Sequence, residues 1–144
     1  RLIERLVPLL RPDGELARVV GLPVDVLWQT GCTPSGHLPI PARPYVPADE
    51  LAAAVAAADL VVSHAGVGSA LTALAAGRRP LLVPRSATVD GFADDHQRQI
   101  AGELQRRGLA MHRDASDLAV GDLVAALSTG VRRAGTPAAF ELLP

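Results

Sequence analysis

The fold is decided by Leu60–Gly77, LVVSHAGVGSALTALAAG. Its first three residues are apolar and unbroken, which is typical of a strand buried on both faces of a parallel sheet. The residues after Ser69 are good helix formers, and Gly77 stands where a helix usually ends. Between these two parts, Gly66 and Gly68 indicate that the chain turns sharply. The stretch therefore predicts a strand, a glycine turn and a helix.

The glycine turn also has the chemistry of an anion site. The first amide groups of a helix have no partner within the helix, and the positive end of the helix dipole lies behind them. Glycines at positions 66 and 68 remove side chains from the space in front of these amides, and His64 and Ser69 add side-chain donors at its edge. A phosphate is the anion most often bound in such a place. Two glycines alone indicate a plain structural turn equally well.

Composition limits the kinds of partner that this chain can have. The 144 residues are 49% hydrophobic with a net charge of −1, which suits one compact domain over 1–144 with a sizeable core. Aromatic residues make up 3% and there is no basic excess, so nucleic acid is not expected as a partner. A single cysteine, Cys32, excludes an internal disulfide and a cysteine metal cluster. We expect no bound metal and a reducing, cytoplasmic compartment.

The start of the sequence predicts a fragment or a trimmed chain. The chain has no initiator Met and begins inside a helical pattern, which is consistent with truncation at the N-terminus. No apolar run is long enough to span a bilayer and no signal peptide is visible. The tail over 134–144 is loose in composition.

Apolar periodicity and chain breakers predict alternating helices and strands. Expected helices cover 1–10, 47–58, 70–76, 96–107 and 116–133, with a further helical turn at 15–21. Expected strands cover 24–29, 60–62, 81–83 and 109–112, with a very short one at 44–46; Trp28 is assigned to the core. This alternation implies an α/β, Rossmann-like parallel sheet flanked by helices. Ligands bind outside the carboxyl ends of such strands, where loops near 30–31, 45–46, 64–69 and 84–97 gather.

Five short motifs stand in order along the chain: Tyr45–Val46, Ala58–Ser69, Ala76–Pro80, Val83–Pro84 and Asp95–Gln97. Together they resemble the C-terminal, donor-binding half of GT-B glycosyltransferases, family 28 in particular. The nearest branches are the small catalytic subunit of the two-part N-acetylglucosaminyltransferase of N-glycan assembly and bacterial exopolysaccharide relatives. The resemblance covers about residues 24–112 and implies the C-terminal half of a GT-B fold.

The resemblance also implies a role for each matched position. The diphosphate of a nucleotide sugar is expected at His64, Ala65, Gly66, Val67, Gly68 and Ser69, in agreement with the anion argument above. The base and ribose are expected at Thr30, Gly31, Tyr45, Val46 and Thr72, with the backbone of Val46 reading the edge of the base. Sugar hydroxyls are expected at Asp95, His96 and Gln97, and Arg85 is a candidate contact for an anionic group. Asp95 serves equally well as a helix cap.

The chain departs from the family pattern at Thr72. Many relatives carry a Glu there, three residues after the Ser or Thr of the motif, which grips both ribose hydroxyls. A single hydroxyl cannot make the bidentate, charge-assisted contact of a carboxylate. A UDP-sugar remains the first expectation for the substrate, with thymidine, guanosine or an altered ribose contact left open.

The function implied by the resemblance is inverting transfer of a sugar from a nucleoside diphosphate to an acceptor hydroxyl. The acceptor is expected to be a glycan or lipid-linked sugar of bacterial polysaccharide assembly. An N-terminal acceptor domain or a membrane-associated partner subunit is implied, which would place the chain at the inner face of the membrane. No catalytic base is identified in this chain, and no cofactor or metal is expected. Two alternatives stay open: a non-catalytic nucleotide-sugar-binding module, and half of a sugar-nucleotide 2-epimerase.

Overall fold

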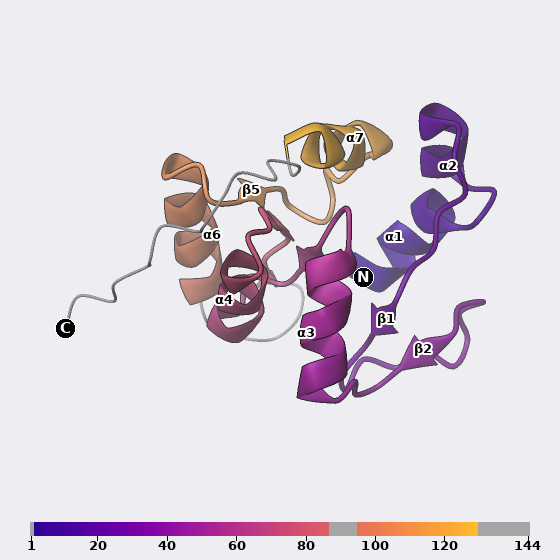
Figure 1. Cartoon of the computed structure of the whole chain (residues 1–144), viewed down its shortest axis with the longest axis horizontal. Coiled ribbons are helices and arrows are strands. Elements are labelled where there is room, and N and C mark those ends of the chain that lie inside the picture. The colour runs from indigo at the N-terminus through magenta and orange to yellow at the C-terminus, as the bar shows by residue number, and fades with distance from the viewer. Residues whose placement is uncertain (1, 87–94, 130–144) are drawn as a thin grey trace.

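Helices and short strands alternate along the chain in the computed structural model, which describes residues 2–86 and 95–129 (Figure 1). The helices are α1 (Leu2–Leu10), α2 (Glu15–Val20), α3 (Ala48–Ala57), α4 (Val67–Ala75), α6 (His96–Arg106) and α7 (Val120–Thr129). The strands are β1 (Trp28–Gln29), β2 (Ala42–Arg43), β3 (Val62–Ser63), β4 (Leu81–Leu82) and β5 (Met111–His112). Every ladder between these strands is parallel, which confirms the α/β class. The predicted tail at 134–144 lies outside the described residues.

The strands form two parallel sheets rather than the single sheet that the sequence predicts. One sheet pairs β1 with β2, and the other has the order β3-β4-β5 with β4 in the centre. The predicted strand at 24–29 is reduced to Trp28–Gln29, and the short strand expected at 44–46 lies instead at Ala42–Arg43. Prolines explain both corrections, because Pro39, Pro41 and Pro44 have no N–H to give to a ladder.

The central strand β4 divides the hydrophobic core. Leu81 belongs with Trp28 to one buried cluster, which also includes apolar residues of α1, α2 and α7. Leu82 belongs to a second cluster with Ala70 of α4 and Ala101 of α6. Leu81 and Leu82 are both fully buried, because successive side chains of a strand point to opposite faces. Figure 1 shows α4 and α6 toward one end of the molecule and α1 and α2 toward the other.

Two helix ends follow the sequence prediction and one helix start does not. Gly77 and Gly108 have φ values of 70° and 71°, so each supplies the left-handed residue that ends α4 and α6. Helix α7 begins at Val120 rather than near 116, because the Asp122 carboxylate accepts the Ala119 amide at 2.9 Å and fixes the first turn there. The predicted end of this helix near 133 lies outside the described residues.

Candidate functional site

The glycine turn leaves a set of backbone donors open. Gly66 is the N-cap of α4 and no side chain caps this helix. The first helical bond runs from the Ala70 amide to the Gly66 carbonyl at 3.1 Å. Among residues 2–86 and 95–129, no acceptor is found for the amides of Val67, Gly68 and Ser69, and all three residues are exposed. These three donors lie at the positive end of the α4 dipole, which favours a negatively charged ligand.

The two glycines are not needed by the turn itself, which corrects the expectation that the chain turns sharply on them. Gly66 has φ −72° and ψ 140°, and neither glycine has a positive φ. A Cβ added at either position would meet nothing within 4 Å. A residue with a Cβ, such as alanine, could therefore adopt the local backbone at either position without a clash. The missing side chains leave open space beside the amides of Val67 to Ser69, which is what close approach of a ligand to the backbone requires.

The ring of His64 is held beside this turn. Its Nδ1 lies 2.8 Å from the carbonyl oxygen of Val83. A carbonyl only accepts, so Nδ1 carries the hydrogen and Nε2 is the ring nitrogen that accepts, or donates once the ring is protonated. The bond joins the loop that follows β3 to the end of the β4 segment, and it fixes the orientation of a half-buried ring.

The predicted sugar-binding residues lie at the start of α6. Asp95 is the N-cap of this helix, but its side chain makes no capping bond. Asp95 and His96 are exposed, whereas Gln97 is half-buried and its Oε1 accepts the Arg85 amide at 2.9 Å. This bond brings the predicted anion contact Arg85 and the predicted sugar contact Gln97 together. The stretch 87–94 of the same predicted loop lies outside the described residues.

The predicted base-binding residues gather at the ends of β1 and β2. The Thr30 amide donates to the Arg43 carbonyl and the Gly31 amide to the Pro44 carbonyl, each at 2.9 Å. Thr30 is buried, and Gly31 has a φ of 57°, a conformation that favours glycine. The two loops that are predicted to hold the base are thus joined by backbone hydrogen bonds.

The backbone of Val46 is covered in this structure. Val46 is 1% exposed, and its amide donates to Oε1 of Gln29 at 2.9 Å. Tyr45, one residue earlier, is 72% exposed. The sequence predicts no role for Gln29, because a contact between a side chain and a backbone amide 17 residues away leaves no periodic signal. The nearest signal is its position directly before the predicted loop residues Thr30 and Gly31.

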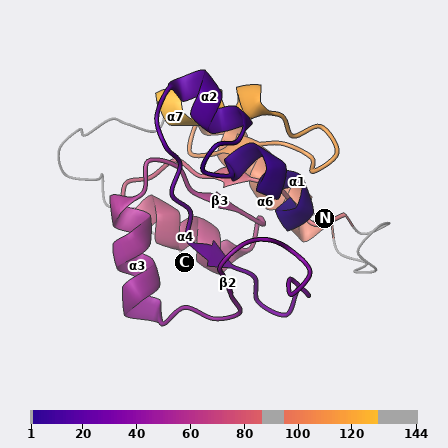
Figure 2. The same cartoon turned by 90° about the vertical axis from the view of Figure 1, so that its right-hand side faces the viewer.

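An ion pair holds the chain on either side of Tyr45 and Val46. Arg43, in β2, makes two hydrogen bonds to the carboxylate of Glu50, in α3, one of them at 3.0 Å. This contact lowers the pKa of the Glu50 carboxyl, with the hydrogen bond from Arg43 as the main cause. Both side chains are exposed to solvent, so the pair positions the segment more than it stabilises the fold. Helix α3 in turn packs against α4, as Figures 1 and 2 show.

Thr72 lies one turn into α4, at the predicted ribose position. Its hydroxyl donates to the Gly68 carbonyl at 2.9 Å. This back-bond uses the single hydroxyl hydrogen within the helix, and the oxygen keeps acceptor capacity. Thr72 can therefore accept one hydrogen bond from a ribose hydroxyl.

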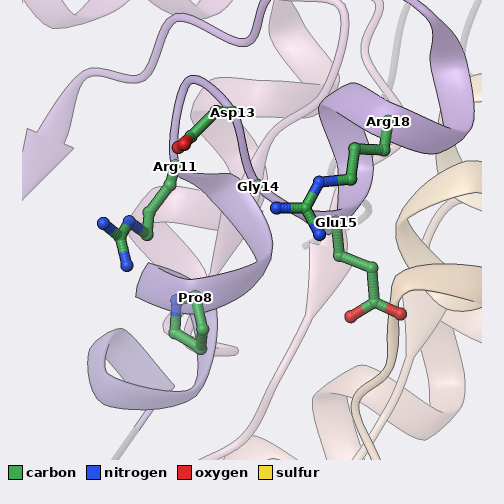
Figure 3. A pocket seen from close by; sticks show the side chains of 6 residues that line it. All are labelled: Pro8, Arg11, Asp13, Gly14, Glu15 and Arg18. Atoms are coloured by element: carbon green, nitrogen blue, oxygen red, sulfur yellow. The ribbon is translucent and has the colours of Figure 1, made fainter.

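A hollow of about 310 Å³ lies elsewhere, between the end of α1 and the start of α2 (Figure 3). It is lined by Arg11, Asp13, Glu15 and Arg18, whose side chains point in different directions. The charges balance and do not converge on one point. None of the predicted site residues lines this hollow.

The described ranges show neither a metal-ligand cluster nor a membrane-spanning helix. Over 2–86 and 95–129, no three His, Cys, Asp or Glu side chains are grouped so that they could hold a metal ion. No helix in those ranges has both the length and the apolar character needed to cross a membrane.

Comparison with known proteins identifies the family. Residues 30–140 match the model of the glycosyltransferase family 28 C-terminal domain. This match covers most of the chain, and the fold and the order of the motifs agree with it. The chain belongs to glycosyltransferase family 28.

Two curated relatives are similar to this chain in sequence, and one solved structure is similar in fold. The UDP-N-acetylglucosamine transferase subunit ALG13 of Yarrowia lipolytica is 46% identical over 59 residues, which are 41% of this chain and 28% of that protein. The UDP-N-acetylglucosamine–N-acetylmuramyl-(pentapeptide) pyrophosphoryl-undecaprenol N-acetylglucosamine transferase of Sorangium cellulosum is 34% identical over 99 residues, 64% of this chain and 24% of that protein. The chain thus spans about a quarter of these relatives' length.

The solved structure is that of the glycotransferase of kitacinnamycin. It superimposes with a TM-score of 0.61 and 22% sequence identity, over 88% of this chain and 30% of that one. At this identity the likeness concerns the fold alone, and it confirms the predicted α/β, Rossmann-like fold.

Proposed function

We propose that this chain is the donor-binding half of an inverting glycosyltransferase that takes a nucleoside-diphosphate sugar, with a UDP-sugar as the first candidate. The observation that carries the proposal is the set of open amides at Val67, Gly68 and Ser69. The names of the curated relatives, which are UDP-N-acetylglucosamine transferases, support the choice of donor.

In the proposed reaction, the task of this chain is to stabilise the leaving group. An acceptor hydroxyl attacks C1 of the sugar and the new C1–O bond forms. The proton of the hydroxyl passes to a general base, which we propose is supplied by the N-terminal domain or partner subunit. The bond between C1 and the phosphate oxygen breaks, and its electron pair leaves with the nucleoside diphosphate. Donors that are already oriented stabilise the charge that develops on this group, an effect worth about 3 to 4 kcal/mol for one well-placed donor.

Each part of the site has a matching task. The amides of the first α4 turn and the ring of His64 would hold the diphosphate. The loops at Thr30–Gly31 and Tyr45–Val46 would hold the nucleoside, and Asp95–Gln97 would bind sugar hydroxyls. Attack on C1 would need an acceptor, which we propose is a glycan or lipid-linked sugar presented by an N-terminal domain or by a membrane-associated partner subunit.

The test is binding followed by turnover. Calorimetric titration of the chain with UDP, UDP-N-acetylglucosamine and inorganic pyrophosphate should give saturable binding of all three, with Ser69 and His64 variants weakened. No binding by any of them at millimolar concentration would refute the proposal. Release of UDP only in the presence of a partner and an acceptor supports a transferase. Conversion of the nucleotide sugar without an acceptor would instead identify an epimerase, and binding without turnover a regulatory module.

A further inference from the structure

The two parallel sheets each end in a strand that has a neighbour on one side alone. Among residues 2–86 and 95–129, β1 pairs with β2 and with no other strand, and β3 pairs with β4 and with no other strand. Figure 1 shows β1 on the inner side of β2, so the second edge of β1 is directed toward the rest of the molecule. The second edge of β3 is the one away from β4.

The ladder bonds of β3 show which of its backbone groups are left over. The Leu81 amide donates to the Val61 carbonyl at 2.8 Å. The Val83 amide donates to the Ser63 carbonyl at 2.8 Å. In a parallel ladder every second residue of a strand bonds to the same neighbour, so the N–H and C=O of Val62 point away from β4. Within the described residues, no partner is found for these two groups.

The same holds for β1. The Thr30 amide donates to the Arg43 carbonyl at 2.9 Å, and the register pairs Gln29 with Arg43. The backbone N–H and C=O of Gln29 therefore point away from β2. In the part of the chain that the structure describes, neither group has a hydrogen-bond partner.

The side chains of β3 are covered less well than those of its neighbour. Leu81, Leu82 and Val83 are 0% exposed, whereas the apolar residues 60–62 are only half-buried. Natural sheets protect a true edge with charged residues, proline or a bulge, and residues 60–63 include no charged residue and no proline. This edge has the composition of a strand that is covered on both sides.

The two inner edges border one core. Val24 and Val26, which precede β1, are half-buried and pack against the cluster that holds Trp28 and Leu81. Val62 of β3 packs against this same cluster. The sequence predicts a strand over 24–29, but β2 pairs only with Trp28 and Gln29. A second neighbour on the inner side of β1 can therefore lengthen this strand.

Helix α1 begins where a strand in this position would end. Helix α3 connects β2 to β3, which is the connection typical of parallel strands, so the strands of both sheets run in one direction. Leu2 and Leu6 of α1 belong to the shared cluster. The Arg5 Nε donates to the Leu118 carbonyl at 2.9 Å, and Leu118 lies between the end of β5 and the start of α7. This contact places the first turn of α1 at the carboxyl edge of the sheets.

We propose that β1 and β3 together bind one further parallel strand, and that the strand is an extended apolar segment joined to the N-terminal end of α1. One side of this segment bonds to the backbone of Gln29 and the other to the backbone of Val62, as in other cases of strand addition. The two sheets become one, in the order β2-β1-new strand-β3-β4-β5, and α1 with α2 forms the crossover from the new strand to β1. The inference rests on the sheet edges and is independent of the proposed nucleotide site.

The experiment measures amide hydrogen exchange by nitrogen-15 NMR in the native chain and in two N-terminal extensions of it. One extension adds Thr-Val-Val-Val-Thr-Gly-Ser-Gly before Arg1. The matched control adds Thr-Pro-Val-Pro-Thr-Gly-Ser-Gly, because proline does not fit a central strand.

In the native chain, the amides of Gln29 and Val62 should exchange at least about tenfold faster than those of Thr30 and Val83, which have partners in the ladders. The valine extension should slow both of the fast amides about tenfold and raise the melting temperature by about 2 to 4 °C. The proline extension should leave both rates and the melting temperature unchanged.

Four results would overturn the proposal. They are slow exchange of both amides in the native chain, protection that rises with the concentration of the native chain and so indicates a second copy, equal effects of the two extensions, and protection of only one of the two amides. If the valine extension prevents folding, the separate peptide acetyl-Thr-Val-Val-Val-Thr-amide takes its place. Protection of both amides of the native chain by this peptide at millimolar concentration supports the proposal, and the absence of protection overturns it.

Discussion

Replacing Gly68 by Ala should separate stability from ligand binding. Gly68 is the second residue of α4, its φ is not positive, and a Cβ would meet nothing within 4 Å. Alanine is the better helix former, so Gly68→Ala should raise the free energy of unfolding by about 0.5 to 1 kcal/mol. For a chain of this size the melting temperature should rise by about 2 to 4 °C.

The same methyl group should harm the proposed site. It would stand on the Cα between the amides of Gly68 and Ser69, where a phosphate oxygen has to come within about 3 Å of the nitrogens. Loss of one charge-assisted hydrogen bond costs about 1.5 to 3 kcal/mol. Affinity for UDP and for inorganic pyrophosphate should therefore fall about 10- to 100-fold.

The control is Gly121→Ala. Gly121 is the second residue of α7 and also follows a valine; a Cβ there would likewise meet nothing within 4 Å. Urea unfolding should show the same gain in stability for both variants, and calorimetry should show lost nucleotide binding for Gly68→Ala alone. Undiminished UDP affinity in Gly68→Ala would refute the claim that the glycine leaves room for a ligand.

Three further substitutions test other parts of the site. His64→Ala should weaken the binding of pyrophosphate and of UDP about tenfold each but leave uridine binding unchanged. The reason is that the ring, oriented by the Val83 carbonyl, is proposed to contact the phosphates. An equal loss of uridine affinity in calorimetric titrations would indicate a purely structural histidine. Thr72→Glu should raise the preference for UDP over 2′-deoxy-UDP severalfold, since a carboxylate accepts both ribose hydroxyls, and an unchanged ratio of dissociation constants would place the ribose elsewhere. Gly77→Ala should lower the free energy of unfolding by about 1 kcal/mol in urea, because its φ is 70°; an unaltered midpoint would mean that α4 does not end there.

The sequence predicts the order of elements well, because each helix and strand carries its own apolar period and its own breaker. The glycine motif predicts a helix start with open amides, and Gly77 and Gly108 predict helix ends that the structure confirms. The extent of the strands was less predictable. The length of a strand depends on how many residues of its partner can donate backbone hydrogen bonds. Prolines at 39, 41 and 44 limit the partner of β1 to Ala42–Arg43.

The side chains that hold the predicted base and sugar loops were not predictable from the sequence. The bonds from Val46 to Gln29 and from Arg85 to Gln97 each join a backbone amide to a carboxamide 12 or more residues away. Such contacts have no periodicity. A glutamine in a sequence also does not by itself indicate a binding site. They become visible only when folding brings β1 beside β2 and the β4 loop beside α6.

The central claim is that the amides at the start of α4 bind a diphosphate. The direct measurement is a nitrogen-15 NMR titration of the labelled chain with inorganic pyrophosphate and then with UDP. The resonances of Val67, Gly68 and Ser69 should move saturably with one dissociation constant per ligand, while that of Gly121, at the equivalent place in α7, stays still. Saturable binding that leaves those three amide resonances unmoved would contradict the claim.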